Sequence, residues 1–262
     1  MKRLQINEIK LLDYLKINKT ISVNEAIHFL DVSESSVRRL FVKLEQSGKC
    51  LRYYGGIRLI SEAIMDIEYS YEGVEFQRSK SKILIAQTAA KLIKPSDVIF
   101  LDSGTTIARF AAAISERIER DNLKNITIFT NSLVNLELLK NANVTLVGGM
   151  YREHRKDFCG YLAEEMLKLL HFNKCFLGTD GFSESNGLTT TDFFTARLNE
   201  IAMKCSDEKY VLMDSSKFFI SSVVSYSRNV SVDAIITDSL PDEIDSMGLN
   251  IIEAGSDKYN EG

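Results

Sequence analysis

The chain has 262 residues, of which 45% are hydrophobic and 26% are charged, and this composition is typical of globular protein with about two domains. No segment holds the roughly 18 consecutive apolar residues that a membrane span needs. The first residues also lack the apolar core of a secretory signal, so we expect a cytoplasmic protein without a membrane partner.

The net charge differs between the two ends of the chain. Residues 1–60 hold 11 Lys and Arg against 6 Asp and Glu, a net charge of +5, whereas the remaining residues carry −9. A basic end on an acidic body favours contact between the small end and a polyanion. The cysteines and histidines are too widely spaced for zinc or redox motifs, so we predict free thiols, no metal site and no cofactor.

Helical patterns occupy the start of the chain. Apolar residues recur at helical spacing over residues 3–17. Ser22 is a good N-cap for a second helix over residues 23–30, whose inner face is apolar. A tight turn at Asp31 and Val32 follows, and such a turn between two short helices is typical of a helix-turn-helix.

A third helix is predicted over residues 34–47, capped by Ser33 and ended by Gly48. Its spacing places four apolar side chains on one core-facing stripe: Val37, Leu40, Phe41 and Leu44. In a helix-turn-helix this second helix of the pair enters the major groove of DNA by its N-terminus.

A β-wing is predicted over residues 50–59, because the segment alternates and turns at Gly55-Gly56. Arg can pair with guanine or phosphate, and Ser can reach either. The candidates for DNA contact are Ser35, Ser36, Arg38, Arg39, Lys43, Arg52 and Arg58. A solvated helix face is the alternative for each helix residue taken alone.

The chain divides, in our interpretation, into a DNA-binding domain over residues 1–60, a linker over 61–78 and a larger domain over 79–262. In the larger domain helices alternate with short apolar strands, which predicts an α/β fold with a mostly parallel sheet flanked by helices. We expect helices at 82–93, 105–120, 133–140, 161–171 and 192–206, and strands at 98–101, 126–129, 144–147, 174–177, 210–213 and 234–236.

Small polar residues follow five of these strands, at the carboxyl ends where ligands of such sheets bind. The segment Asp102-Ser103-Gly104-Thr105-Thr106 directly precedes a helix, so backbone N–H groups, hydroxyls and the helix dipole offer a site suited to phosphate. An ordinary helix cap is the alternative. The other strand ends carry Asn131, Gly148, Gly149, Asp180 and Lys217.

Together these groups predict a pocket for a polyhydroxylated anion, with Lys217 as its countercharge. Because its carboxylate would repel phosphate, Asp102 is expected to accept a hydrogen bond from a sugar hydroxyl or to cap the loop. Loops over 150–160 and 182–195 are expected to discriminate between sugars. We interpret the charged residues of the first loop as solvated rather than as phosphate contacts: Arg152, His154, Arg155 and Lys156.

The N-terminal motifs resemble the DNA-binding signature of the DeoR family of bacterial transcriptional regulators. The segment from Val32 to Arg39, then Leu44-Glu45, Gly48 and Gly55-Gly56, follows that signature in order. Where the family has an acidic residue after its Arg pair, this chain has Leu40. A carboxylate there orients a neighbouring Arg, so the base contacts are expected to differ.

The larger domain resembles the DeoR-family sensor domain through the motifs LDSGTT at 101–106, TNS at 130–132, GG at 148–149, GTDG at 178–181 and DSSK at 214–217. The resemblance implies a fold similar to sugar-phosphate isomerases and coenzyme A transferases. It also implies that a sugar phosphate contacts Asp102, Gly104, Thr105, Thr106, Asn131, Asp180, Lys217 and Glu200. A salt-bridged helix residue is the alternative for Glu200.

The leading hypothesis is a sequence-specific transcriptional regulator, a repressor of a carbohydrate-metabolism operon, whose binding to operator DNA is modulated by a phosphorylated sugar. One winged helix makes too few contacts for gene-level specificity, so we expect a homodimer or homotetramer. No enzymatic activity is expected. The alternatives are a phosphosugar isomerase with an appended DNA-binding domain, using Asp180 or Glu200 as base and Lys217 as stabiliser, and an architectural DNA-binding protein without a ligand.

Overall fold

The computed structural model describes residues 3–18, 20–46, 50–53, 55–59, 71, 74, 77–121, 123–241 and 248–255. The chain forms two compact units, Met1–Asp66 and Ile67–Gly262, called here the N-terminal unit and the C-terminal unit. No helix within the described ranges combines the length and the apolar character that crossing a membrane requires.

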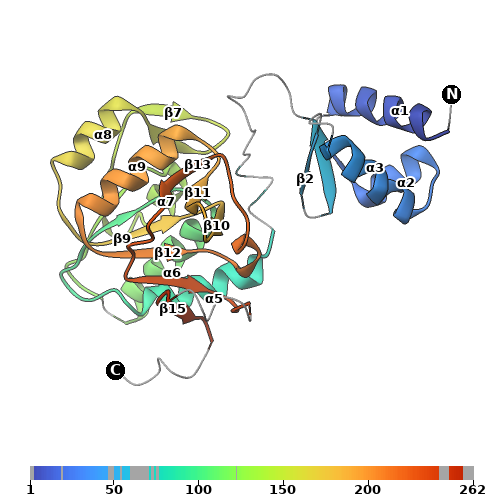
Figure 1. Cartoon of the computed structure of the whole chain (residues 1–262). Coiled ribbons are helices and arrows are strands. Elements are labelled where there is room, and N and C mark those ends of the chain that lie inside the picture. The colour runs from blue at the N-terminus through green and yellow to red at the C-terminus, as the bar shows by residue number, and fades with distance from the viewer. Residues whose placement is uncertain are drawn as a thin grey trace. The chain divides into compact units, whose positions relative to one another are not determined.

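The described residues of the N-terminal unit form three helices and a small antiparallel sheet (Figure 1). The sheet has the order β1-β3-β2, and β2 and β3 form the predicted wing. The elements are α1 (Arg3–Asn18), β1 (Thr20–Ser22), α2 (Val23–Leu30), α3 (Glu34–Gln46), β2 (Cys50–Tyr53) and β3 (Gly56–Leu59). The three predicted helices and the wing are therefore confirmed, while the predicted stop at Gly48 lies outside the described residues.

Local contacts explain why α2 begins and ends where it does. The Ser22 hydroxyl accepts a hydrogen bond from the Glu25 N–H (3.2 Å), and the Glu25 carboxylate accepts one from the Ser22 N–H (2.8 Å), which is a reciprocal capping box. Asp31 ends α2 in the left-handed region, with φ of 51°. The predicted apolar stripe of α3, including Leu40, is buried against α1 and the sheet.

A seven-stranded parallel sheet forms the centre of the C-terminal unit. The short apolar runs predicted as strands lie in it because both faces of such a sheet are buried. Its strands, in spatial order, are β15 (Ile251–Glu253), β14 (Ala234–Thr237), β12 (Ser206–Leu212), β9 (Phe172–Gly178), β4 (Val98–Leu101), β5 (Thr127–Thr130) and β6 (Asn143–Leu146).

Helices cover both faces of this sheet (Figure 1). One core joins α5 (Ser79–Ala90) and α6 (Thr105–Arg120) to the sheet, and the other joins α8 (Tyr161–Lys168) and α9 (Phe193–Lys204) to the opposite face. The short α7 (Leu133–Leu138) packs beside α6. The predicted parallel sheet flanked by helices is confirmed.

Short strands occupy segments for which the sequence predicted loops. A hairpin of β7 (Met150–Arg152) and β8 (Asp157–Cys159) lies within 150–160. A separate antiparallel sheet combines β10 (Gly181–Ser183), β11 (Gly187–Thr190) and β13 (Val224–Ser227). The loop predictions were wrong for β7, β8, β10 and β11, because each has only three or four residues and carries no apolar run. No element was predicted for 224–227, where β13 lies.

The strand order reverses between β4 and β9. From β4 the chain adds β5 and β6 on one side, and from β9 it adds β12, β14 and β15 on the other. In open α/β sheets the loops at such a reversal diverge, and ligands bind there beyond the carboxyl ends of the strands. The loops after β4 and β9 are therefore where the candidate site is centred.

Candidate functional site

Asp102 follows β4 and bridges the point of strand reversal. One carboxylate oxygen accepts a hydrogen bond from the Ser103 N–H (2.7 Å), and the other accepts one from the Gly178 N–H at the end of β9 (3.1 Å). Burial raises the pKa of this carboxyl to about 7, although the two N–H donors oppose the shift. Both carboxylate oxygens thus accept hydrogen bonds from backbone N–H groups, which a residue that caps this loop must do.

The start of α6 lies next to Asp102. Gly104 has φ of 105°, a conformation that favours glycine. No side chain of the described residues caps α6, so the first-turn N–H groups of the helix are left for another acceptor. The Thr105 side chain is buried and that of Thr106 is half-buried. An uncapped helix N-terminus with two hydroxyls can hold an anion.

Asn131 follows β5 and has one unused acceptor. Its Nδ2 donates to the carbonyl of Phe158 (3.1 Å), but no partner for its Oδ1 exists among the described residues although the side chain is only 1% exposed. Gly149, after β6, has a structural reason to be glycine, because a Cβ there would lie 2.5 Å from the carbonyl oxygen of Cys159. At Gly148 a Cβ would meet nothing within 4 Å.

Asp180 and Lys217 lie on the β9 and β12 sides of the site. The Asp180 carboxylate accepts hydrogen bonds from the Thr190 hydroxyl (3.0 Å) and the Thr191 N–H (2.9 Å). A bridge between Phe182 and Phe218 places the Lys217 backbone beside β10. Within the described part of the chain, the half-buried Lys217 side chain makes no ion pair with a carboxylate.

A buried ion network joins the β7–β8 hairpin to α9. Arg152 donates two hydrogen bonds of 2.8 Å to the Asp157 carboxylate and one of 2.8 Å to Asp192. Arg155 forms an ion pair with Asp192 (3.3 Å). The Ser103 hydroxyl donates to Asp157 (2.8 Å), so the network reaches the candidate anion loop.

The interpretation of Arg152 and Arg155 as solvated is wrong, because their side chains are only 9% and 8% exposed. Burial raises the pKa of the Asp192 carboxyl, but Arg155 and Arg152 together outweigh this effect and hold the pKa below its ordinary value. Sequence reasoning missed Asp157 and Asp192 as partners. The available signal was that Asp192 stands at the start of the helix predicted over 192–206, where Asp is a common N-cap, and it does cap α9.

Two further buried groups near Asp102 were also missed. Asn199 of α9 is fully buried, and neither its Nδ2 nor its Oδ1 has a hydrogen-bond partner among the described residues. Its proximity lowers the pKa of the Asp102 carboxyl. The Tyr226 hydroxyl donates to the carbonyl of Gly178 (3.0 Å). Glu200, by contrast, pairs with Arg197 (3.0 Å) about two turns along α9 from its start, and the structure does not bring it to the strand ends.

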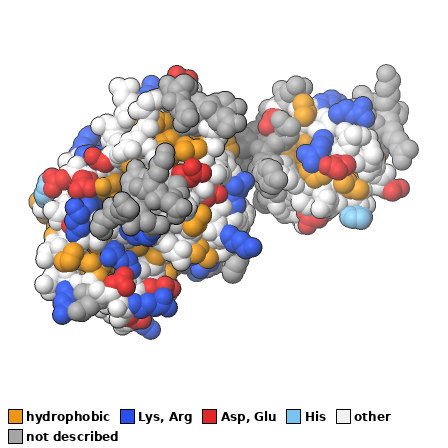
Figure 2. Space-filling model, turned by 90° about the horizontal axis from the view of Figure 1, so that it is seen from below, with side chains coloured by type: hydrophobic (Ala, Val, Ile, Leu, Met, Phe, Trp, Pro, Cys, Tyr) orange, Lys and Arg blue, Asp and Glu red, His pale blue; other side chains and the backbone are white. Residues whose placement is uncertain are grey.

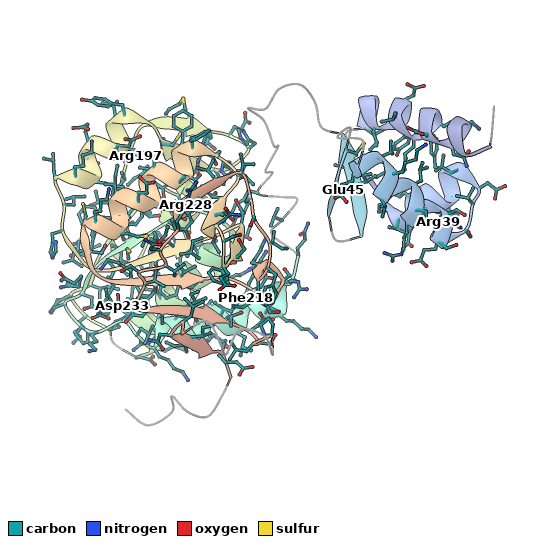
Figure 3. The ribbon with its side chains drawn as sticks, in the orientation of Figure 1. Arg39, Glu45, Arg197, Phe218, Arg228 and Asp233 are labelled. Atoms are coloured by element: carbon teal, nitrogen blue, oxygen red, sulfur yellow. The ribbon has the colours of Figure 1, made fainter. Side chains whose placement is uncertain are left out.

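The candidate DNA contacts of α3 differ in what they already bind. Arg38 forms an ion pair with Glu34 (2.7 Å), and Lys43 forms one with Glu8 of α1 (2.6 Å). Arg39 is exposed, and its Nε donates to the Ser35 carbonyl (3.2 Å). Figure 3 shows Arg39 near the start of α3 and Glu45 nearer the wing. Lys and Arg lie among acidic side chains on the face seen in Figure 2.

Two of the remaining predicted contacts, Arg52 and Arg58, have no described side chain. They lie in β2 and β3, respectively. Ser35 is exposed and Ser36 is half-buried; both hydroxyls lie within hydrogen-bond distance of the Ser33 hydroxyl, at 3.1 and 3.0 Å. Among the described residues, no group of three or more His, Cys, Asp or Glu side chains is arranged to hold a metal ion.

A winged helix-turn-helix together with an α/β domain that has an uncapped helix at its strand reversal defines the class of ligand-responsive DNA-binding regulators. The family model described as the DeoR-like helix-turn-helix domain matches residues 8–63, and that of the DeoR C terminal sensor domain matches residues 77–239. The chain therefore belongs to the DeoR family of transcriptional regulators, and the resemblance found in the sequence is confirmed.

Curated relatives extend over almost the whole chain. The HTH-type transcriptional regulator IolR of Bacillus subtilis is 30% identical over 240 residues, which cover 90% of this chain and 91% of that protein. The lactose phosphotransferase system repressor of Lactococcus lactis subsp. lactis is 33% identical over 233 residues, covering 88% and 89%. The chain is thus a regulator and not an enzyme.

Among solved structures, the chain is similar to ribose 5-phosphate isomerase A from Methanocaldococcus jannaschii. The similarity has a TM-score of 0.42 and 21% sequence identity, and it covers 54% of this chain and 55% of that one.

Proposed function

We propose that this protein is a repressor of a carbohydrate-metabolism operon, and that a phosphorylated sugar controls its binding to operator DNA. Residues 1–60 form the DNA-binding domain, 61–78 the linker and 79–262 the sensor domain in this proposal. Support comes from the family and from the Lactococcus lactis relative, which is named a repressor of a lactose phosphotransferase system.

The observation that carries the proposal is the uncapped N-terminus of α6 at the strand reversal. Its free N–H groups, the hydroxyls of Thr105 and Thr106, and the helix dipole would bind the phosphate group. Gly104 lets the backbone approach the phosphate without a side chain. We assign the neighbouring Ser103 and Asp102 to holding this loop, through Asp157 and Gly178 respectively.

The sugar itself would lie against the polar groups around that phosphate position. The unused Oδ1 of Asn131 can accept a hydrogen bond from a sugar hydroxyl. Lys217 supplies a countercharge, and the carboxylate of Asp180 supplies a further acceptor. A sugar phosphate satisfies all of these groups at once, whereas an unphosphorylated sugar leaves the helix N-terminus without its anion.

We assign operator contact to Arg39, to the neighbouring serines of α3 and to the wing. Since one helix-turn-helix reads one half-site, a homodimer or homotetramer would bind repeated half-sites in the cytoplasm. The effector controls DNA binding only if it prefers one arrangement of the oligomer and DNA prefers another.

The first test is thermal stability of the full chain against a panel of sugar phosphates. Each of several hexose, pentose and triose phosphates is paired with its unphosphorylated sugar, and inorganic phosphate is included. A selective ligand raises the melting temperature by mass action because it binds the native state. A shift with one phosphorylated member and none with its unphosphorylated partner is the expected result. No shift with any member contradicts the assignment of a sugar-phosphate effector.

Thr106→Asp is the matched test of the phosphate position. A carboxylate in the first turn interacts favourably with the helix dipole, so the ligand-free protein keeps its melting temperature. The same carboxylate repels phosphate, so the rise in melting temperature caused by the sugar phosphate disappears. Thr106→Asn, which is neutral and of similar size, should keep most of it. A full shift in Thr106→Asp places the phosphate elsewhere.

A further inference from the structure

Six large apolar side chains are exposed on three adjoining elements of the C-terminal unit. They have exposed fractions of 43–75% and are called here the β7–α8–α9 face: Met150, Tyr151, Tyr161, Leu162, Phe193 and Phe194. Isolated exposed apolar residues are ordinary, but a contiguous group of this kind marks an interaction site.

Strand pairing, an ion pair and direct packing join the three elements. Met150 of β7 pairs with Cys159 of β8, and Gly160 alone separates that residue from the start of α8. The ion pair of Arg152 with Asp192 (2.8 Å) ties β7 to the residue just before Phe193. The elements β8, α8 and α9 also pack directly on one another.

A surface ion pair aligns the two helices of the face. Arg197 of α9 bonds Glu164 of α8 (3.3 Å), and Figure 3 shows Arg197 on α9. Residues three or four apart lie on the same face of a helix. Phe193 precedes Arg197 by four residues and Tyr161 precedes Glu164 by three, so both aromatic rings lie one turn before the same contact. The Tyr161 and Phe193 side chains therefore lie on the same side of the two helices, and Leu162 and Phe194 directly follow them in the chain.

The size of the patch fits a protein partner. At roughly 200 Å² for each fully exposed large side chain, the exposed fractions amount to on the order of 700 Å² of apolar surface. Monomers rarely expose a contiguous apolar patch of more than a few hundred Å², and each partner of a standard stable interface buries about 800 Å². The apolar area thus approaches what one side of a dimer needs.

The charges around the patch decide which partner fits. The nearby helix surfaces carry both signs in internal pairs: Glu164 and Glu200 with Arg197, and Glu165 with Lys168. A nucleic acid or an anionic membrane would require an excess of basic residues. A mixed, internally paired border instead meets a copy of itself without like-charge repulsion, as the self-complementary surface of a two-fold dimer must.

We infer that the β7–α8–α9 face is the surface through which two copies of this chain associate. The inference rests on the proposed function in one respect: reading two half-sites requires a second helix-turn-helix. The buried network of Arg152, Asp157 and Asp192 lies directly behind the face and holds β7 against α9. This network also contacts Ser103, so the face is joined to the proposed phosphate loop.

Analytical ultracentrifugation of the full chain over a range of concentrations tests the inference. The wild-type protein should be a dimer at micromolar concentration. Leu162→Lys on α8 and Phe193→Lys on α9 should each raise the dimer dissociation constant by roughly 30-fold or more, the effect of losing a central anchor. Both side chains are exposed, so neither substitution removes a core contact; circular dichroism and melting temperature verify folding.

Ile83→Lys is the control, because Ile83 is also exposed (42%) and lies on α5, which packs on the opposite face of the sheet from α8 and α9. It should leave the dimer unchanged. The inference is overturned if the control raises the dimer dissociation constant as much as the two variants do. It is also overturned if neither variant changes that constant, or if the wild-type protein is a monomer. The sugar-phosphate shift is measured on the same samples: its absence counts against the proposed effector site, whereas the dissociation constants alone decide the interface.

Discussion

Arg39 is the side chain of α3 best placed to recognise a base. Arg38 and Lys43 already pair with carboxylates, whereas among the described residues the Arg39 guanidinium bonds a carbonyl of its own helix through Nε and no carboxylate. Its remaining N–H donors can form a bidentate pair with guanine. Arg39→Ala should therefore weaken specific binding by about 1–3 kcal/mol and relax the sequence preference at one position.

Fluorescence anisotropy measures this effect on a duplex selected from a random-sequence library by the wild-type protein. Arg38→Ala serves as the control, because an exposed arginine paired with Glu34 is expected to contribute mainly through charge. It should weaken all duplexes to a similar extent. If Arg39→Ala also weakens all duplexes equally, Arg39 binds phosphate and the base-reading role belongs to another residue.

Asp102 makes the stability of the C-terminal unit depend on pH. Burial raises the pKa of its carboxyl to about 7 in the folded protein, against 3.8 as the ordinary value. The folded state therefore retains a proton that the unfolded state has lost between these two pH values. The associated stabilisation is complete below about pH 3.8 and is lost as the pH rises to about 7.

Calorimetry of the full chain compares the wild type with Asp102→Asn, which cannot titrate. The excess stability of the wild type over the variant should fall by on the order of a few kcal/mol across this range, since one pKa unit corresponds to about 1.4 kcal/mol. Because the variant differs only at Asp102, the comparison cancels the contributions of the other carboxyls to the pH dependence. Among these are Asp192 and Asp238, whose lowered pKa values make stability rise with pH. A constant difference between pH 4 and 7 shows that Asp102 keeps a low pKa.

At the scale of elements, the β7–β8 hairpin is held to α9 mainly by charge. Arg152 spans Asp157 and Asp192 from a nearly buried position. Arg152→Met keeps an unbranched apolar stem but removes the closest positive charge from the buried Asp157 carboxylate. Breaking a buried pair in this way costs roughly 3–5 kcal/mol, which for a domain of this size lowers the melting temperature by on the order of 10 °C.

Arg152→Lys separates charge from geometry. A lysine restores one positive charge but cannot make the two parallel bonds to Asp157 together with the third to Asp192. Its melting temperature should fall between those of the wild type and Arg152→Met. If the Arg152→Met and Arg152→Lys variants are both as stable as the wild-type protein, the network contributes no net stability. Its function is then restricted to positioning the hairpin.

The elements with a continuous apolar or helical pattern were predictable from sequence. The strand Val98–Leu101 and the helix Thr105–Arg120 have the predicted bounds, because burial on both faces of the strand and a clear helical period leave a direct imprint. The hairpin at 150–160 leaves none: its strands have three residues each and no continuous apolar run, and tertiary contacts stabilise them. The ends of β9 were predicted less well: the strand was expected at 174–177, and it begins two residues earlier and ends one residue later.

Predictability of the candidate site divides along the same line. Gly104 and Asn131 were found because small polar residues after an apolar strand form a local pattern. Arg155 was misjudged because its partner Asp192 lies 37 residues later, and no local pattern announces such a pairing. Asn199 was missed for a similar reason, since it lies within an amphipathic helix and only the packing of α9 brings it to Asp102.

At the scale of the whole molecule, the DNA-binding motif and the proposed effector site lie in different units of one chain. Communication between them must therefore appear as a coupling free energy. If the sugar phosphate weakens operator binding by a given factor, operator DNA must weaken sugar-phosphate binding by the same factor. Typical coupling of 1–3 kcal/mol corresponds to roughly 5–150-fold.

Titration calorimetry with the identified sugar phosphate tests this reciprocity, first on the free protein and then on the protein saturated with the selected duplex. The factor by which the duplex weakens sugar-phosphate binding should equal, within experimental error, the factor by which saturating sugar phosphate weakens duplex binding. Thr106→Asp, which should lose the effector, binds the duplex with unchanged affinity at every sugar-phosphate concentration. Weakening of operator binding that persists in Thr106→Asp would mean that the sugar phosphate competes for the basic surface of the DNA-binding domain, because direct competition needs no site at α6.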